Sequence, residues 1–136
     1  MVIIRDAVKK DFSQIVSIIN LGAKEGLLLK RTKKDISSQI KENDVIVAQD
    51  DEKIVGIIIL DFYSRRLSEL RSIYVLSDYR KMGVGSMLVE ALKKKAKSKK
   101  VKELITITLK EKISWFKKFG FNEDVHDFKV ALFLRP

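Results

Sequence analysis

The 136-residue sequence contains no cysteine, a single histidine, one proline and six glycines, and each scarcity excludes a class of protein. Without cysteine there are no disulfides, no thiol nucleophile and no thiolate metal ligand. His126 has no companion histidine or spaced carboxylates, so we expect no bound metal. Few glycines and prolines beside 46% hydrophobic residues exclude a collagen-like or disordered chain and favour a folded globular protein.

Long apolar runs are also absent. The longest, from Ile54 to Leu60, is far shorter than the roughly 20 residues that span a bilayer. The N-terminus begins with a strand-like Val2-Ile3-Ile4 rather than with the basic segment and apolar run of a secretory signal. We therefore expect a single cytoplasmic domain over residues 1–136, without a membrane partner.

Positive charge dominates, with 28 Lys and Arg against 18 Asp and Glu for a net charge of +10. Six of the lysines lie between Lys93 and Lys100, where a helix is expected to end. This run is either a solvated helix end, whose cations complement the helix dipole, or a patch that binds polyanions. No aromatic platform for stacking bases accompanies the lysines, so we do not expect nucleic acid as a partner. A homodimer is compatible with the sequence.

The periodicity of apolar residues predicts alternating strands and amphipathic helices. Strands are expected at 2–5, 45–49, 53–62, 68–75, 103–109 and 128–134, and helices at 12–22, 32–43, 84–99 and 112–119. Gly22 is expected to end the first helix, and Thr32 to cap the second. Because hairpins and crossover helices both occur in this order, we expect an α/β (α+β) fold in which helices cover a mixed sheet.

A tight turn, Arg80-Lys81-Met82-Gly83-Val84-Gly85, joins a predicted strand to a predicted helix. The first amides of a helix lack internal partners and lie at the positive end of its dipole, so such a turn suits a phosphate group. Gly83 and Gly85 lack a Cβ and would let a phosphate approach these amides; the alternative is a tight turn with no ligand. The third glycine of the dinucleotide fingerprint and the Gly-Lys-Ser/Thr of the P-loop are absent, so neither NAD nor ATP is expected.

This turn resembles the coenzyme A motif of the GNAT acetyltransferases, Arg-x-x-Gly-x-Gly. The resemblance extends to Ile54-Val55-Gly56, the strand from Glu69 to Val75, Leu76-Ser77-Asp78-Tyr79-Arg80 and Trp115-Phe116-Lys117-Lys118-Phe119-Gly120-Phe121. It implies the GNAT fold, a mixed sheet of about six to seven strands flanked by about four helices. It also implies acetyl-coenzyme A as co-substrate, with the cofactor held by Ile73, Val75, Arg80, Lys81, Met82, Gly83, Val84, Gly85 and Ser86.

Within this family the segment Gly26-Leu27-Leu28-Leu29-Lys30-Arg31-Thr32 is similar to amino-acid acetyltransferases, including the acetyltransferase domain of N-acetylglutamate synthases. The likeness implies transfer of acetyl to a primary amine, that of an amino acid or small metabolite. The alternatives are protein or peptide N-termini, or a non-catalytic regulatory module that binds coenzyme A. The chain departs from the synthases at Lys110-Glu111-Lys112, where they have an arginine for the substrate carboxylate. It departs from many family members at Phe116, where they have a tyrosine that protonates the thiolate.

Acetyl transfer requires a neutral amine, and Glu69 is our candidate for the base. It lies eleven residues before Arg80, a spacing that resembles that of the catalytic glutamate in several GNAT enzymes. The alternative is a strand residue paired with Arg71 on the same face. Arg71 and Arg31 are candidates for binding a substrate carboxylate, or else exposed surface charges. Tyr63 and Tyr74 are alternative general acids or packing residues.

Overall fold

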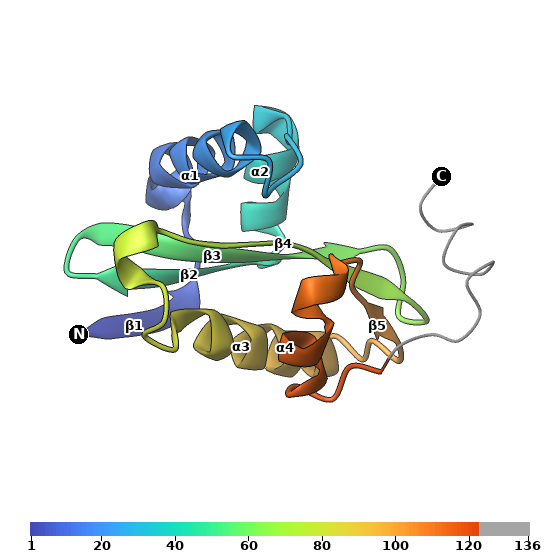
Figure 1. Cartoon of the computed structure of the whole chain (residues 1–136). Helices are drawn as coiled ribbons and strands as arrows, with labels where there is room; N and C mark the ends of the chain where they lie inside the picture. The colour runs from blue at the N-terminus through green and yellow to red at the C-terminus, as the bar shows by residue number, and fades with distance from the viewer. Residues whose placement is uncertain (123–136) are drawn as a thin grey trace.

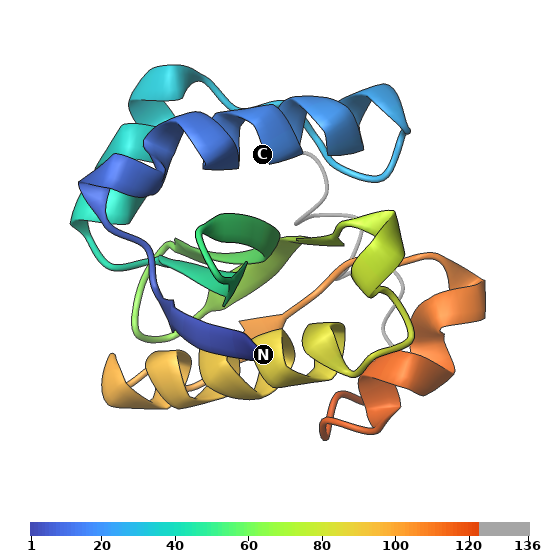
Figure 2. The same ribbon diagram turned by 90° about the vertical axis from the view of Figure 1, so that its left-hand side faces the viewer.

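The computed structural model describes residues 1–122, which form a five-stranded sheet with helices on both faces (Figures 1 and 2). The strands are β1 (Val2–Asp6), β2 (Val45–Asp50), β3 (Lys53–Phe62), β4 (Ser68–Val75) and β5 (Leu104–Ile105). The helices are α1 (Phe12–Lys24), α2 (Lys33–Lys41), α3 (Val84–Ser98) and α4 (Ile113–Lys117), with 3-10 turns η1 (Lys9–Asp11), η2 (Ser77–Tyr79) and η3 (Lys110–Lys112). Within this part of the chain, no helix is long and apolar enough to cross a membrane.

The sheet is mixed, as predicted, with the strands in the order β1-β2-β3-β4-β5. The pairings β1–β2, β2–β3 and β3–β4 are antiparallel, with α1 and α2 inserted between β1 and β2, and β4 pairs with β5 in parallel after the crossover through α3. Residues 1–122 supply five strands rather than about six to seven, and the strand predicted at 128–134 lies outside the described residues. The predicted strand 103–109 was too long, because only Leu104 and Ile105 pair with β4.

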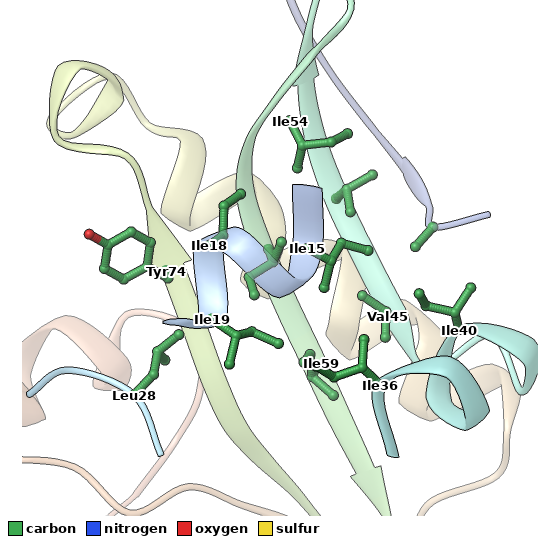
Figure 3. Packing of buried hydrophobic residues seen from close by; sticks show 13 residues of the cluster. Ile15, Ile18, Ile19, Leu28, Ile36, Ile40, Val45, Ile54, Ile59 and Tyr74 are labelled. Carbon is green, nitrogen blue, oxygen red and sulfur yellow. The ribbon is translucent and has the colours of Figure 1, made fainter. Parts of the chain in front are cut away.

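One face of the sheet is covered by α1 and α2, as Figure 3 shows. Ile15, Ile19 and Ile36 have almost no exposed surface and pack onto Ile57 and Ile59 of β3. Burying one such side chain contributes roughly 1.5–3 kcal/mol. The two helices are thus held by a continuous aliphatic layer, and Thr32 caps α2 as predicted, accepting the N–H of Asp35 at 3.0 Å.

Gly22 does not end α1, as the sequence had suggested, but lies within it. An added Cβ would come within 2.6 Å of Leu28 Cδ1 and 3.1 Å of Tyr74 Cδ2. The glycine therefore allows the loop after α1 and strand β4 to approach the helix closely. The helix ends two residues later, at Lys24, shortly before Gly26, which has a positive φ of 75°.

The opposite face is covered by α3 and α4. Leu88 and Leu92 of α3 and Phe116 of α4 pack against Ile58 and Leu60 of β3. Two lysines of the Lys93–Lys100 run also attach α3 to the sheet: Lys95 pairs with Asp6 at 2.6 Å, and Lys99 pairs with Asp44. Part of the lysine run therefore has a structural partner, and its use as a polyanion patch stays a prediction.

A β-bulge interrupts β4 next to the candidate base. Ile59 pairs with Ser72 and Leu60 with Leu70, so Arg71 is an extra residue on β4. Beyond the bulge Glu69 pairs with Asp61, which alternates with Ile59 along β3. Glu69 therefore lies on the α1/α2 face together with Ser72. The bulge replaces the simple alternation by which Glu69 and Arg71 were expected to share a face.

Two bidentate pairs, Arg5 with Asp11 and Arg31 with Asp61, hold segments outside the strands to the sheet. Arg5 binds both carboxylate oxygens of Asp11 at 2.7 and 2.9 Å, and Asp11 also accepts the N–H of Val8 at 2.8 Å. The Arg5 hydrogen bond is the largest cause that lowers the pKa of Asp11, although burial acts against it.

We expect Asp11→Asn to lower the free energy of unfolding by about 1–3 kcal/mol at neutral pH, because Arg5 loses a charged hydrogen-bond partner. Since the folded pKa of Asp11 is lowered, its stabilising effect is complete above the ordinary value of 3.8 and is lost as the pH falls through the folded value. Urea unfolding should therefore show the gap between the two proteins closing below that pH. A gap that stays constant there would contradict this assignment.

Candidate active site

The site begins where β4 and β5 separate. Their parallel pairing covers only Ser68 with Leu104 and Glu69 with Ile105. Thr106 then donates its hydroxyl to the carbonyl of Leu70 at 2.9 Å, and beyond this bond β5 ends. Within residues 1–122, the rest of β4 up to Val75 has no strand on this side. Its free backbone groups can pair with the amides of an extended ligand, much as an added strand would.

The predicted cofactor residues lie along this free edge and in the turn that follows it. Ile73 and Val75 are half-buried residues of the edge itself. Gly83 is the N-cap of α3 with a φ of 81°, a left-handed conformation that favours glycine. A Cβ at this position would meet nothing within 4 Å, so the space next to it is open. Lys81, Met82, Val84 and Ser86 occupy the same turn or the first turn of the helix.

The first amides of the 15-residue helix α3 meet that open space. They have no partner within the helix and lie at the positive end of its dipole. A pyrophosphate fits here, because a concave set of N–H groups with no side chain in front of it is the usual cradle for phosphate. The residues present are thus suited to a phosphorylated cofactor such as coenzyme A.

Gly85 has a different role from Gly83. An added Cβ there would lie 3.4 Å from Cζ2 of Trp115, at the limit of a tight contact. Trp115 in turn packs edge-to-face against Phe116 and Phe119, with ring centroids 4.9 Å apart in both pairs. Gly85 therefore lets α4 pack closely against the start of α3. Phe116 is part of this buried cluster, and its ring carries no group that can protonate a leaving thiolate.

Arg80 is anchored at the end of β4, next to the turn at Gly83. Its Nε donates to the carbonyl of Val75 at 2.8 Å, and its guanidinium lies 5.1 Å from the ring centroid of Tyr74. Glu25, at the end of α1, accepts the Tyr74 hydroxyl at 2.5 Å and lies 3.6 Å from Arg80 Nη2. Burial, then the bond to Glu25, raises the pKa of Tyr74. Tyr74 thus has a structural partner and supports Arg80 beside the phosphate turn.

Glu69 is buried at 8% exposure and is held by Tyr63, whose hydroxyl donates to Oε1 at 2.8 Å. Burial, then this hydrogen bond, raises the pKa of Tyr63 to about 12, while Arg71 acts in the opposite direction. The second oxygen, Oε2, makes no hydrogen bond to the described residues, and none of their unpaired side-chain oxygens is fully buried. Oε2 is therefore not fully buried and keeps a free acceptor site among the described residues.

The two arginines predicted to bind a carboxylate have different environments. Arg71 is exposed at the bulge and lies close enough to Tyr63 to affect the pKa of its hydroxyl. Arg31 is buried and forms a bidentate pair with Asp61, at 2.7 and 2.9 Å. The structure thus brings Glu69, Tyr63 and Arg71 together and places the guanidinium of Arg31 inside the protein. A substrate contact of Arg31 stays a prediction.

Sequence reasoning missed Asp61 and the hydrogen bond from Tyr63 to Glu69. One signal for Asp61 was available: it is an acidic residue directly after the apolar run 54–60, in a strand whose other central residues are aliphatic. A cavity of about 520 Å³ opens beside Asp61 and Tyr63. Its lining consists of Ser38, Gln39, Glu42, Asp44, Asp61, Phe62, Tyr63, Arg65 and Lys99.

Known proteins resemble this chain over most of its length. Residues 41–123 match the family described as the acetyltransferase (GNAT) domain. An uncharacterized N-acetyltransferase of Chlorobaculum tepidum is 33% identical over 120 residues, which cover 88% of this chain and 75% of that protein. An amino-acid acetyltransferase of Buchnera aphidicola is 26% identical over 118 residues, 87% of this chain but only 26% of that protein. The chain thus spans about a quarter of the length of the amino-acid acetyltransferases it matches.

A solved structure shares the fold. N-acetylglutamate synthase from Neisseria gonorrhoeae, complexed with coenzyme A and N-acetyl-glutamate, superimposes with a TM-score of 0.80 at 23% identity. The alignment covers 93% of this chain and 30% of that protein. At this identity the likeness concerns the arrangement of the sheet and helices.

We expect Gly83→Val to weaken coenzyme A binding by about tenfold or more, equivalent to about 1.4 kcal/mol, because the side chain enters the space in front of the α3 amides. The positive φ adds a folding cost of roughly 1–2 kcal/mol. Gly120→Val is the matched control, since Gly120 also has a positive φ and an open Cβ position but lies after α4. Calorimetry on both variants separates backbone strain from steric exclusion of the cofactor; equal coenzyme A affinities in the two variants would contradict the assignment.

Valine at Gly85 is a less informative test, because it would also displace Trp115.

Proposed function

The chain belongs to the GNAT acetyltransferase family and is an acetyl-coenzyme A-dependent acyltransferase, and we propose that it acetylates the α-amine of an amino acid or a related small metabolite. One observation carries the proposal: at the point where β4 and β5 separate, Glu69 has a carboxylate oxygen that is not fully buried and makes no hydrogen bond to residues 1–122, close to an exposed arginine. The oxygen suits an amine, and the arginine suits a carboxylate on the same molecule.

Residues at the start of α3 and on the edge of β4 would hold the cofactor. The amides at the start of α3 and the side chain of Arg80 would hold the pyrophosphate, and the edge of β4 around Ile73 and Val75 would offer backbone hydrogen bonds to the amide groups of the cofactor. When bound, acetyl-coenzyme A supplies the thioester carbonyl that the amine attacks. Glu69 and Arg71 lie on the same strand, at its bulge.

Glu69 acts as the general base. An amino acid carries a protonated α-amine at neutral pH, and Oε2 removes this proton directly or through one water. Tyr63 fixes the other oxygen, so the carboxylate keeps one orientation. The pKa of Tyr63 is raised to about 12 by burial and by its hydrogen bond to Glu69, so its hydroxyl is a weak acid for the leaving thiolate. Solvent therefore protonates the leaving thiolate.

Arg71 is the better placed of the two candidate carboxylate ligands. It is exposed beside Tyr63, whereas Arg31 is buried against Asp61. Relatives named amino-acid acetyltransferases support an amino acid as acceptor, although each is a much longer protein. A peptide N-terminus is the competing acceptor, and it would not need a carboxylate ligand next to the amine.

We expect Glu69→Gln to lower turnover by roughly 10²–10⁴, because the amide cannot accept the proton, while coenzyme A affinity is little changed. Glu103→Gln is the control, since Glu103 is exposed at the same end of the sheet and its side chain makes no hydrogen bond to the described residues. Steady-state rates with saturating acetyl-coenzyme A across the neutral pH range measure the effect. Equal turnover in wild type and Glu69→Gln would move the base elsewhere.

We expect Arg71→Ala to lower kcat/KM for an amino-acid acceptor by about 10–100-fold, the loss of one charge-assisted contact of about 1.5–3 kcal/mol. The effect should disappear with the α-amide of the same amino acid, which keeps the amine and lacks the carboxylate. Arg66→Ala removes a neighbouring exposed guanidinium and should change neither rate. If acid and amide react equally fast with the wild type, the acceptor is recognised without its carboxylate and a peptide N-terminus becomes the better candidate.

A further inference from the structure

The guanidinium of Arg31 is saturated by hydrogen bonds within the protein. Nη1 donates to Asp61 Oδ1 at 2.7 Å and to Gln39 Oε1 at 3.1 Å. Nη2 donates to Asp61 Oδ2 at 2.9 Å and to Ser72 Oγ at 2.9 Å, and Nε donates to the same hydroxyl at 3.3 Å. A guanidinium has five N–H donors, so these bonds use all of them.

The acidic partner is equally occupied. Asp61 Oδ1 accepts from Gln39 Nε2 at 2.7 Å in addition to Arg31, and the side chains of Asp61 and Arg31 are only 9% and 7% exposed. A new carboxylate could bind Arg31 only by displacing Asp61, which would leave a buried charge without its partner. Removing one member of a buried ion pair in this way is strongly unfavourable.

This network lies directly beside the candidate base. Asp61 is the cross-strand neighbour of Glu69, and directly opposed residues have Cβ atoms about 4.5–5.5 Å apart. Ser72 follows the bulge residue Arg71 on β4. An amino acid whose amine reaches Glu69 therefore approaches two arginines, of which Asp61 neutralises one.

We propose that Asp61 determines acceptor specificity by keeping Arg31 from the substrate. The inference rests on the proposed amino-acid acceptor and narrows it to amino acids with one carboxylate. Arg71 binds the α-carboxylate. A second carboxylate finds no free guanidinium in the network and would lose its hydration without gaining a cationic partner, so dicarboxylic amino acids are rejected. Specificity of this kind comes from a polar group left unpaired in the wrong acceptor as well as from contacts with the right one.

Two acceptors of nearly equal size test the proposal: glutamine and glutamate. We expect wild type to prefer glutamine over glutamate by about 10–100-fold in kcat/KM, the range for one unpaired or repelled charge. Asp61→Asn removes the negative charge and leaves Arg31 partly unpaired. It should shrink this preference at least about tenfold, mainly through a lower KM for glutamate.

Asp11→Asn is the matched control, because Asp11 is also a buried partner in a bidentate pair, with Arg5, and contacts no residue of the site. It should lose stability without changing the ratio of glutamine to glutamate rates. Replacing both partners, Arg31→Met with Asp61→Leu, should keep the wild-type preference, because no cation is released. A loss of glutamine activity in this double variant alone would show that Arg31 itself binds the acceptor, and would overturn the proposal.

Two further outcomes decide the matter. Wild type that acetylates glutamate as well as glutamine, or a folded Asp61→Asn protein with an unchanged ratio, would refute the role of Asp61. Should Asp61→Asn not fold, Ser72→Ala frees two donors of Arg31 and should shift the ratio in the same direction. If no free amino acid reacts but peptides do, the small-metabolite acceptor is wrong. Peptides that begin with glutamine and glutamate then test Asp61 by the same comparison of rates.

Discussion

The short parallel pairing between β4 and β5 is the constraint on which the site depends. Two residue pairs, Ser68 with Leu104 and Glu69 with Ile105, hold the strands together. The pairing ends where the hydroxyl of Thr106 donates to the carbonyl of Leu70. A longer pairing would have filled the edge of β4 with protein hydrogen bonds. Because it stops, the same strand that carries the base also presents free backbone groups toward the phosphate turn.

The β4 bulge provides the second half of this arrangement. One extra residue changes which side chains face α1 and α2, so the base is placed in a buried, hydrogen-bonded setting while its neighbour Arg71 stays in solvent. The loop between α1 and α2 contributes Arg31 to the same place and ties it to β3 through Asp61. Two arginines thus lie close to the base. The exposed Arg71 can bind a ligand, whereas the buried Arg31 holds its loop to β3.

Patterns of apolar residues predicted most element positions, and β4, at Ser68–Val75, matched the prediction residue for residue. Predictions from neighbouring residues were less reliable where tertiary contacts determine the structure. Gly22 lies within α1 because Leu28 and Tyr74 pack against it, and β5 is short because only Leu104 and Ile105 pair with β4. The turn at Gly83 was identifiable because its chemistry is local. The bulge at Arg71 and the pairing of Arg31 with Asp61 were not, since the bulge depends on the register between β3 and β4 and the ion pair joins residues 30 positions apart.

The bond between Lys95 and Asp6 joins positions separated by 89 residues. Strand β1 can therefore contact helix α3 only after all the residues between them have been synthesised. Until then one face of the sheet, with aliphatic residues such as Ile58 and Leu60, has no cover. Contacts between such distant positions slow folding and leave apolar surface open to aggregation. During synthesis, the emergence of α3 from the ribosome should therefore be the step after which the nascent chain aggregates less and needs chaperones less.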